Sequence, residues 1–319
     1  MPMTDTRRAF LQIHFCVLLW GFTAILGKLI TLPALPLVWW RMLIVVAALA
    51  LVPRVWRGVR AMPARLVWSY AGIGVLVSLH WLTFYGSIKL SNASVGATCI
   101  ALATVMTALV EPWLARSRLS KRDVVLGIAV LPGVALVVGG VPGEMRLGIA
   151  VGAVSALLVA LFGSLNKRLV EHGDALTVTA IELGAGTITL TLLAPLMPLL
   201  PGLSDAFAGD LLVLPGGRDT LYLLALALAC TLLPFALSLV ALRHMSAFSA
   251  QLAVNLEPVY AIILAIILLG EQRELSTQFY VGVAVILGAV LVHPLLGSRP
   301  SDVNQPEALA TAESKHVAD

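Results

Sequence analysis

Ten apolar stretches alternate with short polar segments along the chain. Each is about as long as the roughly 20 residues that a transmembrane helix needs to cross the hydrocarbon core. The polar segments between them are too short to form a soluble domain. The pattern therefore predicts an all-α membrane protein with ten transmembrane helices. These helices are expected to begin near Phe10, Leu35, Leu66, Ser94, Val124, Leu147, Ala175, Leu221, Phe248 and Gln278.

Composition agrees with this fold class. Apolar residues make up 59% of the 319 residues, and charged residues make up 12%, about half the share in soluble domains. The three cysteines, Cys16, Cys99 and Cys230, lie inside apolar stretches, so we expect neither a disulfide framework nor a metal site. The sequence also lacks the motifs of nucleotide-binding and protease sites, and no cofactor is expected.

Positive charges are sorted to alternate loops, which predicts the orientation. If Arg7 and Arg8 precede the first span on the cytosolic side, most of the 21 Lys and Arg residues fall on that side. The net charge of +4 is then a feature of the inner membrane leaflet and its lipids, not a nucleic-acid surface. We expect a plasma membrane protein, in bacteria of the inner membrane, with both termini cytosolic. The basic residues on the outer side are Lys28, Arg41, Lys89, Arg146, Arg218 and Arg273.

Two similar segments, 127–138 and 282–293, each end a block of five predicted helices. Because five is an odd number, the second block would enter the membrane in the opposite orientation. Inverted repeats of this kind are typical of secondary transporters. The predicted organisation is a cytosolic N-terminus (1–9), two inverted five-helix repeats (10–141 and 142–297) and a disordered cytosolic tail (298–319).

Ionisable side chains inside predicted spans are candidates for function, because each costs about 2.5–3.5 kcal/mol to insert. Glu257 lies well inside the ninth span, and Pro258 can bend the helix towards a cavity. Desolvation there favours the protonated carboxyl, so Glu257 is a candidate for proton coupling. Glu182, in the seventh span, is a second candidate. For both, a structural carboxyl paired with a neighbouring helix is the alternative.

Candidate substrate-binding residues are aromatic or polar side chains at similar depths. His80 and Trp81 can stack on an amphipathic molecule, or can simply pack in the core. Arg41 lies near the outer end of the second span, where an arginine often snorkels to the surface. Gln251 and Asn255 share one face of the ninth span, but Glu257 points about 200° away from Asn255 on a regular helix. These three face one cavity only if Pro258 rotates the helix locally. The predicted substrate-binding set is Trp20, Arg41, His80, Trp81, Gln251 and Asn255.

A series of residues occurs in a recognisable order along the chain: Trp20-Gly21, Lys28, Arg41, Gly127 and Gly133 in the first half, then Pro258, Gly270-Glu271, Gly282 and Gly288 in the second. In their order and spacing these positions resemble the EamA family of the drug/metabolite transporter superfamily. The resemblance covers about residues 10–296 and implies a ten-span inner-membrane carrier made of inverted five-span halves. It also favours export of an amino acid or a similar metabolite.

The sequence as a whole predicts a secondary active transporter rather than an enzyme. It would move a small amphipathic metabolite through the lipid bilayer by alternating access, coupled to protons or to exchange of a counter-substrate. One alternative is an intramembrane lipid-modifying enzyme that uses Glu257, Glu182 and His80 as acid/base groups. A passive channel is another alternative. The sequence predicts neither the substrate nor the oligomeric state.

Overall fold

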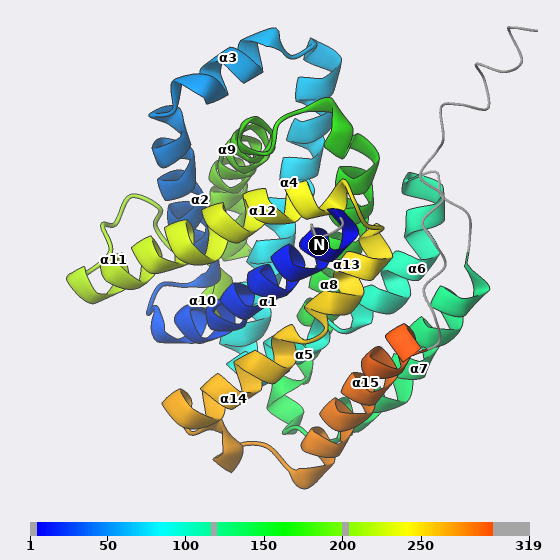
Figure 1. Ribbon diagram of the computed structural model, residues 1–319. Coiled ribbons are helices and arrows are strands. Elements are labelled where there is room, and N and C mark those ends of the chain that lie inside the picture. The colour runs from blue at the N-terminus through cyan, green and yellow to red at the C-terminus, as the bar shows by residue number, and fades with distance from the viewer. Residues whose placement is uncertain (1–4, 116–119, 200–203, 296–319) are drawn as a thin grey trace, which may run out of the picture.

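A computed structural model describes residues 5–115, 120–199 and 204–295 of the protein. All regular secondary structure within these residues is helical (Figure 1), which confirms the predicted class. The predicted disordered tail, 298–319, lies outside the described residues.

The first half of the chain forms seven helices. They are α1 (Asp5–Leu29), α2 (Ala34–Ala50), α3 (Pro53–Ala61), α4 (Ala64–Leu90), α5 (Ala93–Cys99), α6 (Leu102–Leu114) and α7 (Lys121–Gly139). Each predicted start in this half lies within a few residues of a helix start. Two helices have no predicted start of their own: α3, which follows the second predicted span, and α6, which continues the fourth predicted span after a break.

The second half continues with the same kind of helices and several short turns. Its longer elements are α8 (Arg146–Leu169), α9 (Ala175–Leu193), α11 (Gly217–Leu224), the π-helical η4 (Ala225–Leu232), α12 (Leu233–Leu242), α13 (Ala247–Val254), α14 (Glu257–Leu269) and α15 (Thr277–Leu295). The short elements are η1 (Gly143–Met145), η2 (Val170–His172), η3 (Ala194–Leu199), α10 (Ser204–Phe207) and η5 (Glu271–Arg273).

Seven helical stretches in the described residues are long and apolar enough to cross a membrane. The pair α2 and α3, which is bent by 92° between its two helices, counts as an eighth if the two helices form one span. Shorter apolar helices cover Gly127–Gly139 and Thr277–Ala289, where the fifth and tenth spans are expected. The protein is therefore a multi-pass membrane protein, whereas ten spans and inverted repeats stay predictions.

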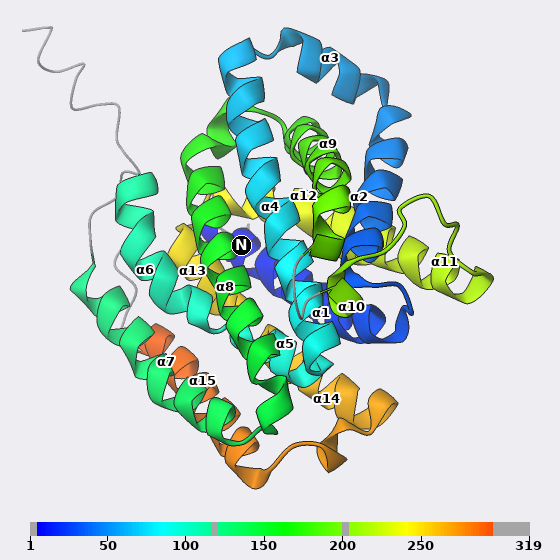
Figure 2. The ribbon, with the colours of Figure 1, turned by 180° about the vertical axis from the view of Figure 1, so that it is seen from behind.

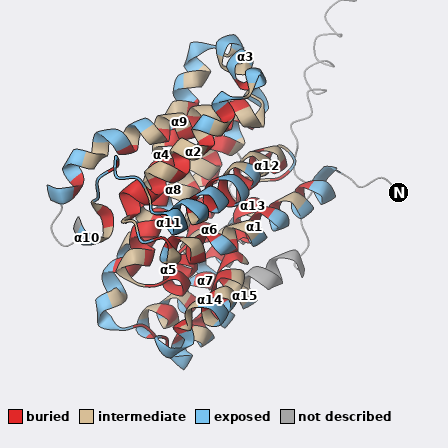
Figure 3. Ribbon diagram, turned by 90° about the vertical axis from the view of Figure 1, so that its left-hand side faces the viewer, coloured by how far each residue is buried: buried red, intermediate tan, exposed pale blue. Residues whose placement is uncertain are grey.

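The helices pack around α1, α4 and α8 (Figures 1 and 2). Helix α8 approaches α4 and α6 closely because small side chains line that face, which favours close packing in membranes. Helices α7 and α15 form a separate pair at one edge of the bundle (Figure 2). Exposed residues lie on the outer faces of the helices (Figure 3), and many are large and apolar, as lipid contact requires. The residues of the small-residue face are Gly148, Gly152, Ala156, Ala160 and Ser164.

Candidate functional site

Two broken helices cross near the middle of the bundle. The break between α5 and α6 lies at Ile100-Ala101, and the break between α13 and α14 lies at Asn255-Leu256. At both breaks the backbone N–H groups donate to the carbonyl three residues earlier, which tightens the helix locally. The Asn255 side-chain amide donates to the Thr104 hydroxyl at 2.5 Å, so the two breaks are in direct contact.

A central cavity of about 120 Å³ opens beside this crossing, lined by α1, α2, α4, α8, α12, α13 and α14. A single water needs only about 10–15 Å³ of such space, so the cavity has room for a small solute. Six of the predicted site residues line it, namely Trp20, Arg41, His80, Trp81, Gln251 and Glu257. Asn255 and Glu182 are not part of its lining.

Arg41 is buried in the floor of the cavity, with a relative exposure of 2%. Its Nε donates to the Thr231 hydroxyl at 2.5 Å, and its Nη1 donates to the Tyr85 hydroxyl at 2.9 Å. The guanidinium carbon lies 3.8 Å from the centre of the Trp81 ring, which is cation–π geometry. This placement differs from the surface snorkelling that we considered from sequence.

The π-helical segment η4 places Thr231 next to Arg41. The Thr231 hydroxyl also donates to the Leu226 carbonyl five residues earlier, at 2.6 Å. Pro234 follows at the start of α12 and has no N–H to close the preceding turn, which accounts for the wider helix before it. Local π-helix is common at functional sites. The predicted substrate-binding set includes neither Thr231 nor Tyr85.

Glu257 is the first residue of α14 and lines the same cavity. Its carboxyl has no hydrogen-bond partner in the part of the chain that the structure describes. Pro258 lies in the first turn of α14, where its missing N–H leaves no helical bond unmade. The break before Glu257 resets the direction of the helix, so Gln251 and Glu257 both reach the cavity, whereas Asn255 turns to Thr104.

His80 and Glu182 have neutral partners. His80 Nδ1 lies 2.8 Å from the Ser155 hydroxyl and 3.0 Å from the Ser155 carbonyl oxygen. The His80 ring packs against Phe84 and Phe162. Glu182 is fully buried behind the cavity, where one carboxyl oxygen accepts from the Asn166 amide at 3.3 Å. Glu182 and Arg41 therefore do not pair, and Glu182 does not cluster with Glu257 in the cavity.

Two lysines join α1 and α4 at the end of the bundle where α1 finishes. Lys28 Nζ donates to the Ser91 carbonyl at 3.3 Å, and Lys89 Nζ donates to the Ile30 carbonyl at 2.5 Å. Each helix thus places a cation on carbonyl groups at the other's C-terminus, where the helix dipole favours positive charge. We call this pair of contacts the α1–α4 clasp.

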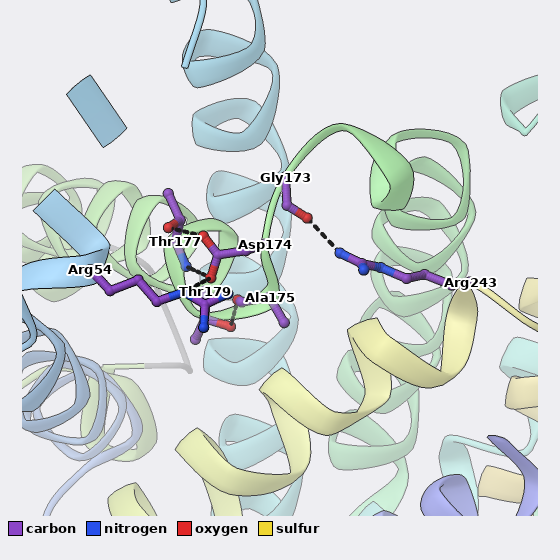
Figure 4. A network of polar contacts seen from close by, with 7 residues as sticks. All are labelled: Arg54, Gly173, Asp174, Ala175, Thr177, Thr179 and Arg243. Carbon is purple, nitrogen blue, oxygen red and sulfur yellow. Dashed lines mark hydrogen bonds and ion pairs between the residues drawn. The ribbon is translucent and has the colours of Figure 1, made fainter. Parts of the chain in front are cut away.

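A matching arrangement joins α8 and α12 at the opposite end, where α1 begins. Lys167 Nζ donates to the Leu242 carbonyl at 2.7 Å, and Arg243 Nη2 donates to the Gly173 carbonyl at 2.7 Å. Figure 4 shows the Arg243 contact beside Asp174, which caps α9 through Thr177 and lies 4.0 Å from Arg54. We call the Lys167 and Arg243 contacts the α8–α12 clasp.

Two buried glutamates cap the broken helices at these ends. Glu271 accepts hydrogen bonds from the Ala93 and Ser94 backbone N–H groups at the start of α5, both at 3.0 Å. Glu111 does the same for Ala247 and Phe248 at the start of α13, at 2.9 and 2.7 Å. A carboxylate at a helix N-terminus satisfies free N–H groups and complements the dipole.

The sequence analysis places Lys28 and Lys89 among the outer basic residues and predicts none of these contacts at the helix ends. A usable signal was present in the sequence, since Lys28, Lys89, Lys167 and Arg243 each lie at or next to the C-terminal end of a helix.

Comparisons with known proteins agree with this architecture. The profile of the EamA-like transporter family matches residues 7–139 and 146–293. An uncharacterized transporter from Clostridium kluyveri is 22% identical over 249 residues, which cover 76% of each chain. A solved crystal structure of a protein shares the fold with a TM-score of 0.64 at 19% identity, covering 91% of this chain and 97% of the other. Because the family profile matches most of its length, the chain belongs to the EamA-like transporter family.

Proposed function

We propose that this protein is a secondary active carrier that exports a small amphipathic metabolite, an amino acid or a similar molecule, by alternating access across the plasma membrane. The observation that carries the proposal is the central cavity, which combines charged, amide and aromatic side chains at the crossing of two broken helices. Discontinuous helices that meet at a midplane site are characteristic of secondary transporters.

The packing of the helices supports two inverted repeats of five spans each. Helix α1 packs against α12 and α14, and α8, its proposed counterpart, packs against α4 and α6. In the proposed repeats α12 corresponds to α4 and α14 corresponds to α6, so the contacts of α1 and those of α8 are equivalent. Helices α7 and α15 pack against each other, as do α2 and α9, which fits a two-fold axis between equivalent helices.

The two clasps support gating at both ends by equivalent elements. The α1–α4 clasp joins the first and third proposed spans at one end, and the α8–α12 clasp joins the sixth and eighth at the other. The cavity extends from Arg41 towards the end where α1 begins, because Asn166, Leu242 and Ala247 belong to its lining. Alternating access then requires the clasps to loosen in turn.

Glu257 is the proposed proton-coupling residue, because its carboxyl faces the cavity without a hydrogen-bond partner among the described residues. Arg41 and His80 line the same cavity and are the other titratable or charged groups that face it. Protonation of Glu257 removes a negative charge from a poorly solvated cavity. The charge of a bound solute therefore changes how readily Glu257 binds a proton, and the proton changes how well the solute binds. Glu182 is a less favourable candidate, because it lies behind Asn166.

Reconstituted protein tests the proposal directly. A thermal-shift screen of proteinogenic amino acids and small organic acids on purified protein selects a solute, which is then radiolabelled for counterflow into proteoliposomes. We expect saturable uptake that unlabelled internal solute accelerates. A passive channel would show no such acceleration, and that result would refute the carrier.

The same vesicles test the proton role. An imposed pH difference should accelerate net flux of the wild type and leave Glu257→Gln unaffected, while counterflow by the variant persists. Glu144→Gln is the matched control, because Glu144 is exposed on η1. An unchanged response to the pH difference in Glu257→Gln would remove Glu257 from the coupling.

A further inference from the structure

We infer that Arg41 binds a carboxylate of the transported molecule, so that the substrate class is a small organic acid or zwitterion with an apolar body. This inference rests on the proposed carrier function and names the group by which the cavity recognises its solute. The observation that supports this inference is that N–H groups of Arg41 and Gln251 in the cavity have no acceptor among the described residues.

Arg41 is a buried cation that makes no direct ion pair with any described residue; the Glu257 carboxyl lines the same cavity and acts on the guanidinium only from beyond ion-pair distance. In the described part of the chain, no carboxylate lies within ion-pair distance of its guanidinium. Its two hydrogen-bond acceptors, Thr231 and Tyr85, are neutral hydroxyls, and its Nη2 group has no acceptor within residues 5–115, 120–199 and 204–295. A guanidinium carries five N–H donors in a planar fork that matches a carboxylate. A buried charge in this state is costly, and an anion in the cavity would neutralise it.

Gln251 gives independent support for an acceptor-rich ligand. Its side-chain amide nitrogen is buried against the cavity and has no hydrogen-bond partner among the residues that the structure describes. Arg41 and Gln251 are on different helices, α2 and α13, and both present donors without acceptors. A carboxylate has two acceptor oxygens and satisfies such a pair better than an amine or an alcohol.

The rest of the lining accommodates an apolar body. The Trp81 ring covers one face of the Arg41 guanidinium, which leaves the edge of the fork for the ligand. Trp20, Phe84, Phe162 and Phe235 provide aromatic surface elsewhere in the cavity. The arrangement separates one charged anchor from a large apolar surface, and this separation selects amphipathic acids over sugars or polyanions.

Binding of three probes with the same phenyl body tests the assignment. Phenylacetate, phenylacetamide and 2-phenylethylamine are titrated against purified protein at low chloride by calorimetry. Phenylacetate should bind at least tenfold more tightly than the amide, as expected for a charge-assisted hydrogen bond, and the amine should bind most weakly. Equal binding of acid and amide, preferred binding of the amine, or no saturable binding of the acid would overturn the inference.

Variants assign the effect to Arg41. Arg41→Gln should weaken phenylacetate binding by about tenfold or more and change phenylacetamide binding little. Arg57→Gln, on the exposed face of α3, is the matched control and should retain the full preference. Equal weakening of acid and amide in Arg41→Gln would refute the assignment. The probe series on the wild type remains decisive if that variant fails to fold.

Transport data separate this inference from the function on which it rests. Acid-selective binding without any counterflow would contradict the carrier but keep the carboxylate site. Counterflow of a solute without preference for a carboxylate would keep the carrier and contradict the role of Arg41.

Discussion

At the scale of residues, the protein holds a charged group at the centre of a membrane domain by surrounding it with neutral oxygens and aromatic rings. Thr231 and Tyr85 fix two nitrogens of Arg41, and Trp81 covers its face. These contacts orient the guanidinium without neutralising it. The proposed carboxylate ligand would use this charge, which a direct salt bridge to a protein carboxylate would prevent.

Removing the hydroxyl of Thr231 should show how much this support contributes. Thr231→Val keeps the side-chain volume but leaves the Arg41 Nε–H without an acceptor, so we expect a loss of about 1–3 kcal/mol of stability. The measurement is the unfolding midpoint in detergent. Thr189→Val is the control, since the Thr189 hydroxyl donates only within its own helix, to Ala185. Equal effects of the two substitutions would argue against a special role for Thr231.

At the scale of elements, close helix contacts depend on particular glycines. A Cβ added at Gly133 in α7 would lie 2.7 Å from the Gly282 carbonyl oxygen of α15, and one added at Gly282 would lie 2.6 Å from the Gly133 carbonyl oxygen. Both contacts involve backbone atoms, which cannot rotate away. The two helices can lie this close only because neither residue has a side chain.

Alanine substitutions at two helical glycines should therefore have opposite signs. Gly133→Ala should destabilise the protein by about 1–3 kcal/mol, because the added methyl overpacks the α7–α15 contact. Gly184→Ala in α9 meets nothing within 4 Å and should stabilise it by about 0.5–1 kcal/mol through helix propensity. Unfolding midpoints of the two variants provide the comparison. A stabilising Gly133→Ala would contradict the observed packing.

The carboxylate cap on α5 gives a second prediction at this scale. Glu271→Gln loses one acceptor oxygen and the charge, so one of the two N–H groups, of Ala93 or Ser94, loses its partner, at a cost of about 1–3 kcal/mol. Hydrogen exchange should become faster at the amides of Ala93 and Ser94. Glu144→Gln, on an exposed residue, should leave that segment unchanged. Unchanged exchange in Glu271→Gln would mean that the cap does not hold the helix start.

At the scale of the whole molecule, the same three devices occur at both ends of the bundle. A lysine on one helix donates to a backbone carbonyl group at the end of a second helix, and a cation on the second helix donates to a carbonyl group at or just after the end of the first. A glutamate caps the N-terminus of a broken helix at the same end. An alternating carrier needs equivalent closures at its two ends, since each must open while the other stays shut.

Weakening one clasp should expose the cavity from one side of the membrane. The reporter is Ser238→Cys, which lines the cavity, in a background without Cys16, Cys99 and Cys230. Lys89→Gln should raise labelling by an impermeant thiol reagent from the side where α1 ends, by about two- to tenfold. Arg243→Gln should do so from the side where α1 begins. Increased labelling from the same side in both variants would contradict two-ended gating.

The positions of the helices and the membrane class were predictable from the sequence alone. The length of an apolar stretch and the proline and polar residues at its ends are local properties of the sequence. The starts of α2, α8 and α9 accordingly lie at or within one residue of their predicted positions. The repeated glycine pattern at Gly133 and Gly282 was also visible as a sequence match. Their contact across α7 and α15 was not, because it depends on how two helices meet.

Which polar residues share a site was decided only by the tertiary structure. On a regular helix the side chains of Asn255 and Glu257 point in different directions. The break at Asn255-Leu256 changes the direction in which the following side chains point, so that Gln251 and Glu257 face one cavity. Arg41 lies near a span end in sequence, yet packing of α4 and η4 over it removes it from the surface. Helical periodicity describes one helix at a time, whereas a binding site depends on distances between helices, and those distances follow from packing.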